Sequence, residues 1–276
     1  MTDAASAHPG PLGRLWGLLG YFPATWRAID QQAATERKAR GDAYDSAAPQ
    51  ILVACAALLS AEWYWGDRPF FHELFGAAIE ASAALRPYAD LLAFSWWSAA
   101  KVLGFLLLPM LHIKLLGGSL RDFGMPLGGA VGHGGPTLRW GRLYVGLYLL
   151  LLPVLVLASR NPAFRETYPF YRQVGRSTFD LLAWELQYAL TFLCVEFFFR
   201  GYLLFGLRRA LGSHAIFVMT VPYCLLHALK PAAESFGAIV AGIVLGTLAL
   251  ASGSIWFGVL IHVSVAWTMD LLASLR

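Results

Sequence analysis

A glutamate and an arginine stand one helical turn apart in an otherwise apolar stretch, CVEFFFRGY, which contains Glu196 and Arg200. An ionisable side chain inside a bilayer costs about 2.5 to 3.5 kcal/mol even on insertion scales. Opposite charges at i and i+4 on a helix neutralise each other, and glutamate on the N-terminal side is the favourable order. We interpret the pair as a functional element inside a membrane; a helix-stabilising ion pair is the alternative.

Two histidines, His227 and His262, follow in later apolar stretches. Taken alone, each is typical of a hydrogen-bonded core histidine, but together with Glu196 they indicate a site. A buried carboxylate beside the Arg200 guanidinium can act as a general base on water. Glu196 and the two histidines could instead bind a divalent metal such as zinc, and their spacing leaves both possibilities open. We expect a site that requires no cofactor, with zinc bound by His227, His262 and Glu196 as the alternative.

The composition of the chain indicates the environment in which these residues lie. The chain has 276 residues, of which 58% are hydrophobic and 14% charged, and a mean hydropathy of +0.56. These values exclude an ordinary soluble domain and fit an all-α, multi-pass membrane protein, which in a bacterium would lie in the inner membrane. The net charge of +4 is not gathered into basic runs with aromatics, so no nucleic-acid partner is expected. The three cysteines lie in apolar segments and form no CxxC pattern.

About seven transmembrane helices are predicted from the apolar segments, together with short interfacial helices. The segments are 47–65, 91–116, 141–159, 179–207, 214–229, 234–252 and 254–274. The short segment 214–229 is acceptable if other helices surround it. Residues 70–85 read as an amphipathic helix, and residues 117–138 as a glycine-rich loop.

We expect three regions along the chain. Residues 1–46 form a cytoplasmic or interfacial N-terminal segment, in which Pro23 limits the stretch from Leu12 to Trp26 to a short helix. Residues 47–176 form an N-terminal transmembrane region with the interfacial helix and the glycine-rich loop. Residues 177–276 form the catalytic transmembrane core. Lysine and arginine before the first span, between the second and third, and after the fourth predict a cytoplasmic N-terminus.

Four other ionisable residues in the apolar segments are assigned expected positions. Glu62 and Lys101, in the first and second spans, are expected to reach toward the membrane interface as snorkelling groups. Asp270, two turns beyond His262, is expected to be exposed at the end of the last helix. Glu185, three turns before Glu196, either lines the same cavity or contacts headgroups.

Three motifs in order carry a resemblance to a known family. They are EFFFRG from Glu196, Tyr223-x-x-x-His227, and GSIW from Gly253, which leads to His262. With these motifs, residues 177–274 resemble the CPBP (Abi) family, the group of Rce1-like CAAX proteases and of glutamate-type intramembrane proteases. The resemblance implies that Glu196, Arg200, His227 and His262 are catalytic. It also implies a membrane-associated protein or peptide as the substrate, met within the lipid bilayer.

Two positions depart from the family pattern. The first motif usually begins with two glutamates, but here the first position is Val195. The third motif usually has asparagine or aspartate four residues after the histidine, where this chain has Ala266. Thus the chain is a divergent member in which either Glu196 is the base or the chemistry is altered or lost.

Other functions remain open from the sequence. One alternative is a non-catalytic protein that kept the fold and serves membrane protein maturation or surface anchoring. Another is a thiol-dependent sorting enzyme that uses Cys194 as nucleophile, although Cys194 and Glu196 lie about 200° apart on an ideal helix. A transporter should show inverted repeats or broken helices, and the sequence shows neither.

Overall fold

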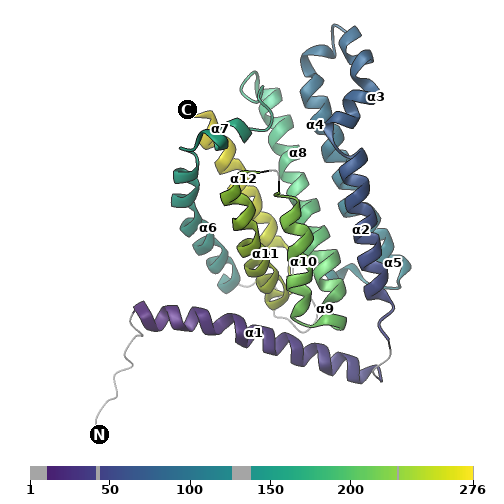
Figure 1. Ribbon diagram of the computed structural model, residues 1–276, viewed down its shortest axis with the longest axis vertical. Helices are drawn as coiled ribbons and strands as arrows, with labels where there is room; N and C mark the ends of the chain where they lie inside the picture. Colours follow the sequence, from purple (N-terminus) through teal and green to yellow (C-terminus); the bar gives the residue numbers. More distant parts are fainter. Residues whose placement is uncertain (1–10, 42–43, 126–137, 229, 276) are drawn as a thin grey trace.

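A computed structural model describes residues 11–41, 44–125, 138–228 and 230–275, and in this part of the chain every regular element is a helix. Figure 1 shows a bundle of roughly aligned helices with one long helix, α1, lying across one end. The helices are α1 (Pro11–Ala39), α2 (Ala47–Trp65), α3 (Arg68–Ala81), η1 (Arg86–Tyr88), α4 (Ala89–Lys101), η2 (Val102–Leu107), α5 (Leu108–Leu115), η3 (Leu120–Phe123), α6 (Leu138–Ala158), α7 (Pro162–Thr167), α8 (Thr178–Glu196), η4 (Phe197–Phe205), α9 (Gly206–Leu211), α10 (His214–Leu225), α11 (Ala232–Ser252) and α12 (Trp256–Ser274).

Six stretches within the described residues are long and apolar enough to cross a membrane, which confirms a polytopic helical membrane protein. They are Ala47–Ala81, Arg86–Leu115, Trp140–Ala158, Thr178–Leu211, Ala232–Ser252 and Trp256–Ser274. The seventh predicted segment, 214–229, holds α10, whose 12 residues are too few to span by themselves. Much of α10 is nonetheless buried, because it packs against η4, α9 and α11.

The N-terminal helix α1 is longer than the sequence suggested. Pro23 lies inside this 29-residue helix, so the expectation of a short helix ended by Pro23 is wrong. Contacts with the bundle hold α1 in place: Trp26 Nε1 donates to Thr247 Oγ1 at 3.0 Å, and Asp30 Oδ1 accepts from the Ser213 amide at 2.7 Å. Its position across the end of the bundle suits a helix in the membrane interface (Figure 1).

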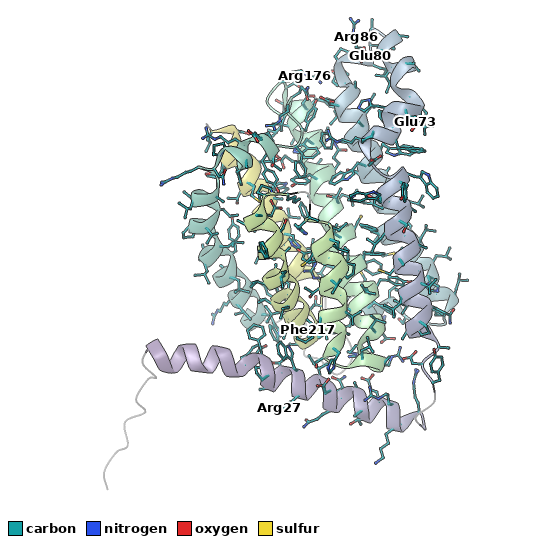
Figure 2. The ribbon with its side chains drawn as sticks, viewed as in Figure 1. Arg27, Glu73, Glu80, Arg86, Arg176 and Phe217 are labelled. Carbon is teal, nitrogen blue, oxygen red and sulfur yellow. The ribbon has the colours of Figure 1, made fainter. Side chains whose placement is uncertain are left out.

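Charged side chains mark the two ends of the bundle. Figure 2 shows Arg27 on α1 at one end and Glu80, Arg86 and Arg176 at the other. The part between these ends is rich in exposed apolar side chains, such as Leu150 on α6 at 73% exposure. This distribution is typical of a membrane protein whose apolar belt faces lipid. In Figure 1, α1 and the end of α12 lie at opposite ends of the bundle.

The best-buried span runs through α8, η4 and α9. All nine residues of the π-helix η4 are buried. A second π-helix, η2, packs against it, with Phe105 and Phe198 stacked at 4.3 Å between ring centroids. On the other side, α11 approaches α10 closely, because a Cβ at Gly242 would lie 2.8 Å from Thr220 Cγ2. The span that carries the candidate residues is thereby enclosed by other helices.

The third sequence motif forms the turn that sets the position of α12. Gly253, with φ of 67°, ends α11 in the left-handed region that favours glycine. The Ile255 amide then donates to the Gly124 carbonyl at 3.1 Å, and Trp256 Nε1 donates to the Met125 carbonyl at 2.6 Å. These bonds tie the start of α12 to the segment after η3. Most of the predicted glycine-rich loop, residues 126–137, lies outside the described residues.

Candidate active site

Glu196 and Arg200 meet at the junction of α8 with η4. Glu196 is the last residue of α8, and Arg200 is the fourth residue of the π-helix. Both side chains are fully buried, and Arg200 Nη1 lies 3.0 Å from Glu196 Oε1. Single π-helical turns within α-helices are frequent at functional sites. The sequence-predicted pair is therefore formed inside the bundle, with no aqueous surface to screen it.

His262 of α12 contacts the same carboxylate oxygen. Its Nδ1 lies 2.6 Å from Glu196 Oε1, and its ring stacks on Phe192 of α8 with centroids 5.6 Å apart. Gly258, one turn earlier on α12, allows this approach, because a Cβ at that position would overlap Glu196 Oε2. The sequence did not single out Gly258 as part of the site.

Tyr223 of α10 connects the Arg200 guanidinium and the His262 imidazole around the carboxylate. Its hydroxyl lies 3.0 Å from His262 Nε2, and the Arg200 Cζ atom lies 4.0 Å from its ring centroid. A carboxylate near Nδ1 favours the imidazole N–H on that nitrogen, so Nε2 accepts from the tyrosine hydroxyl. Tyr223 was identified in the sequence only as the first residue of the second motif.

The Glu196 carboxylate, the Arg200 guanidinium and His262 Nδ1 lack hydrogen-bond partners within the described part of the chain. The contacts from Arg200 and His262 are within ion-pair distance but do not have hydrogen-bond geometry, so both Glu196 oxygens count as unsatisfied. The hydroxyl of Tyr144 on α6, which interacts electrostatically with Glu196 and Arg200, is also buried without a partner. Buried polar groups are normally paired. Their concentration here is typical of a site that binds water or a substrate.

His227 lies beside this cluster rather than in it. It follows the end of α10, its Nδ1 lies 3.1 Å from the Tyr223 carbonyl oxygen, and its ring centroid is 5.0 Å from that of Tyr223. The structure thus brings Glu196, Arg200 and His262 into contact, and it places His227 one residue away. Among the described residues, no group of three or more His, Cys, Asp or Glu side chains is arranged to hold a metal ion. His227, His262 and Glu196 do not form such a group.

Three ionisable residues have positions that differ from the sequence prediction. Glu62 and Lys101 form an ion pair between α2 and α4, with Lys101 only 7% exposed and its Nζ 4.1 Å from the Trp97 ring centroid. They are not snorkelling groups, because each satisfies the other within the protein. Asp270 is buried, not exposed, since it accepts a hydrogen bond of 2.7 Å from Trp184 Nε1.

Cys194 faces away from the carboxylate cluster. It is fully buried in the same apolar cluster as Phe105 and Phe198, and it interacts electrostatically with Lys101 and Glu62. The Cys194 thiol therefore lies on the side of α8 that faces α2 and α4.

These features define a multi-pass helical membrane protein with a carboxylate, a guanidinium and an imidazole in contact inside its core. Comparison with protein families gives the particular class: residues 177–268 match the model of the type II CAAX prenyl endopeptidase Rce1-like family. The chain thus carries an Rce1-like domain over about a third of its length, which confirms the family resemblance of the three motifs. No curated protein and no solved structure gave a match to the chain. The matched family is one of CAAX-protease-like hydrolases that act on membrane-associated protein substrates.

Proposed function

We propose that the chain is an intramembrane endopeptidase in which Glu196 activates a water molecule without a metal. The observation that carries this proposal is the contact of one fully buried carboxylate with both Arg200 and His262. A buried acid between two cationic or hydrogen-bonding groups is an arrangement suited to general-base catalysis. The Rce1-like match over the helices that carry these residues supports the same reaction class.

In the proposed reaction, Glu196 takes a proton from water as the water oxygen attacks the scissile carbonyl carbon. The tetrahedral oxyanion is stabilised by His227, beside Tyr223, because both ring nitrogens of His262 already contact Glu196 and Tyr223. Glu196 then gives its proton to the leaving amine as the carbon–nitrogen bond breaks. Arg200 holds the carboxylate in position through their contact at 3.0 Å.

A non-catalytic member of the fold is the second candidate, favoured by Val195 and Ala266 where the family motifs have polar residues. Ala266 is buried in the apolar cluster of Trp184 and Tyr188, so its position offers no polar group to the site. The position of Cys194, on the side of Lys101 and Glu62, argues against a thiol-dependent sorting reaction at the Glu196 cluster.

The test is a comparison of membrane protein fragments from cells that carry the wild-type chain, Glu196→Gln or no chain. New N-termini are labelled chemically and identified by mass spectrometry. Fragments that require the wild-type chain should fall about 10²- to 10⁴-fold in Glu196→Gln at equal protein abundance. Glu185→Gln, the same change on the same helix outside the contact set, is the matched control. Undiminished fragments in Glu196→Gln would show that the base lies elsewhere or that the protein is not a glutamate protease.

A further inference from the structure

Tyr144 of α6 is a buried polar residue that lies outside the family match. The residue is only 4% exposed, and its hydroxyl has no hydrogen-bond partner among the described residues. The Rce1-like match begins at residue 177, after α6 has ended. Burial of a hydroxyl without a partner is unfavourable, so we expect a small group beside it that satisfies it.

The packing of Tyr144 places it beside the candidate active site. Helix α12 contacts α6 on one side and α8 on the other (Figure 1). Tyr144 belongs to an apolar cluster with two leucines of α11, and its ring stacks on Phe257 of α12 with centroids 5.1 Å apart. The residue after Phe257 is Gly258, whose Cα lies against Glu196 Oε2. Tyr144 is thus packed beside the part of α12 that contacts the carboxylate.

The charged groups around the Tyr144 hydroxyl belong to that same site. The hydroxyl interacts electrostatically with Glu196, then with Arg200, and less strongly with Tyr21 of α1. Both Glu196 carboxylate oxygens and all three Arg200 guanidinium nitrogens also lack hydrogen-bond partners in the described structure. A hydroxyl, a carboxylate and a guanidinium therefore share one buried region without satisfying one another. A small polar molecule among them would satisfy several of these atoms at once.

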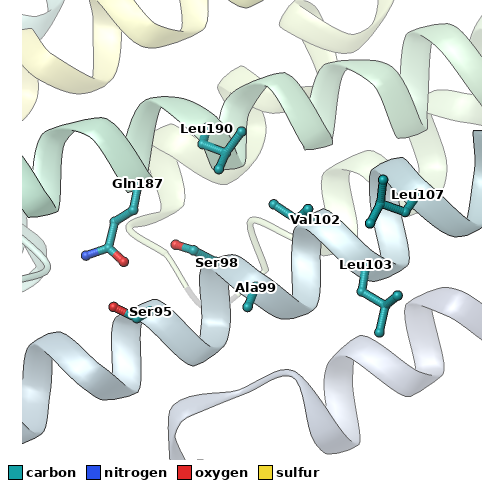
Figure 3. A pocket seen from close by; sticks show the side chains of 8 residues that line it. All are labelled: Ser95, Ser98, Ala99, Val102, Leu103, Leu107, Gln187 and Leu190. Carbon is teal, nitrogen blue, oxygen red and sulfur yellow. The ribbon is translucent and has the colours of Figure 1, made fainter.

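Unpaired polar atoms elsewhere in the bundle have different surroundings. Ser98 Oγ and Gln187 Nε2 also lack partners, but they face each other between α4 and α8 (Figure 3). The described residues that line this pocket include no charged side chain. The Tyr144 hydroxyl, in contrast, lies in the region of a carboxylate that can act as a base.

We propose that Tyr144 and Glu196 together bind the water molecule that attacks the substrate, which makes Tyr144 a further catalytic residue. A buried water makes about three hydrogen bonds. The water can accept from the Tyr144 hydroxyl and from an Arg200 N–H, and it can donate to the Glu196 carboxylate. Because these atoms are enclosed by helices, a molecule of this size fits their surroundings. The assignment rests on the proposed function, since it names what holds the water that Glu196 activates.

Tyr144 orients the water in this reaction and keeps its own proton. The hydrogen bond from its hydroxyl fixes the water oxygen beside Glu196. A lone pair of that oxygen forms the new bond to the scissile carbonyl carbon, and Glu196 takes the proton as the water O–H bond breaks. No bond to Tyr144 forms or breaks. Its loss should therefore lower kcat and leave KM unchanged.

The test compares Tyr144→Phe with Tyr148→Phe, which lies one turn further along α6. Tyr148 is the matched control, because its hydroxyl lies 2.6 Å from Thr268 Oγ1 and so has a partner within the protein. In the assay of labelled N-termini, Tyr144→Phe should lower the fragment yield about 5- to 150-fold, and Tyr148→Phe should leave it unchanged. A peptide that covers a mapped cleavage site then separates kcat from KM.

Stability should change in the opposite order. In a thermal melt in detergent, Tyr144→Phe should keep Tm within about 2 °C of the wild type, because its hydroxyl has only water as a partner. Tyr148→Phe should lower Tm by about 2 to 4 °C, because it removes a hydrogen bond between α6 and α12. X-ray diffraction from crystals of the full chain in a lipidic mesophase gives a readout that needs no activity. A water should lie within about 3.2 Å of both the Tyr144 hydroxyl oxygen and a Glu196 oxygen.

The possible results separate this assignment from the proposed function. Wild-type fragment yield in Tyr144→Phe, together with its loss in Glu196→Gln, would overturn the role of Tyr144 and leave the glutamate protease standing. A fall in Tm for Tyr144→Phe as large as that for Tyr148→Phe would show a structural hydroxyl instead. If Glu196→Gln keeps its fragments, the proposed function fails, and diffraction decides the water site alone. A Tyr144 hydroxyl bonded only to protein groups in that map would overturn it.

Discussion

Replacement of Gly258 by alanine tests the geometry of the carboxylate cluster most directly. In a helix interior alanine is favoured over glycine by about 1 kcal/mol. A Cβ at Gly258, however, would overlap Glu196 Oε2, and that carboxylate is held by contacts with Arg200 and His262. Overpacking of a buried site costs about 1 to 3 kcal/mol. Because the carboxylate cannot swing aside, the upper end applies, and we expect a net loss of about 2 kcal/mol.

A thermal melt in detergent measures this loss. A fluorogenic thiol dye reports unfolding as Cys55 and Cys194, both buried, become accessible. At about 2 to 4 °C per kcal/mol, Gly258→Ala should lower Tm by about 4 to 8 °C and abolish proteolysis. Gly237→Ala in α11 is the matched control: nothing lies within 4 Å of its Cβ position, so Tm should rise by about 2 to 4 °C.

A double variant tests whether steric overlap with Glu196 causes the loss of stability in Gly258→Ala. In a Glu196→Ala background the overlapping atoms are gone, so Gly258→Ala should lose its penalty and behave like the Gly237→Ala control. The coupling between the two positions should reach about 3 kcal/mol, because a loss of about 2 kcal/mol becomes a gain of about 1 kcal/mol. The reasoning is refuted if Gly258→Ala raises Tm on its own and leaves proteolysis unchanged.

Four further outcomes are expected. Arg200→Ala should destabilise the protein by about 3 to 5 kcal/mol in the same melt, and more than Glu196→Gln does, because it leaves a buried carboxylate unpaired; equal melts would contradict this. Reporter fusions at Arg40 and Ser274 should report opposite sides of the membrane, because α1 and the end of α12 lie at opposite ends of the bundle, and a common side would contradict this arrangement. Cys194→Ser should keep most proteolytic activity; its loss, with a thioester-linked fragment on the wild type, would favour a sorting enzyme. Purified active protein should hold far less than one equivalent of zinc and tolerate chelators, whereas stoichiometric zinc with chelator-sensitive activity would establish a metalloenzyme.

Local patterns in the sequence were sufficient to predict the class of fold and the pairing of Glu196 with Arg200. Hydrophobic runs of about 20 residues predict spans because each helix must satisfy its own backbone in lipid. Glu196 and Arg200 were recognisable because their spacing on one helix fixes their proximity. The motif order also indicated an Rce1-like domain: the resemblance covers residues 177–274, and the family model matches residues 177–268.

Contacts between distant helices were decided only by the tertiary structure. His262 and His227 look equivalent in the sequence, yet the first contacts Glu196 and the second contacts Tyr223. Lys101 was expected at an interface, but it pairs with Glu62 on another helix. Such placements depend on helix rotation and on close packing at residues such as Gly258. Sequence periodicity shows which face of a helix is apolar, but it does not specify which side chain of another helix that face will contact.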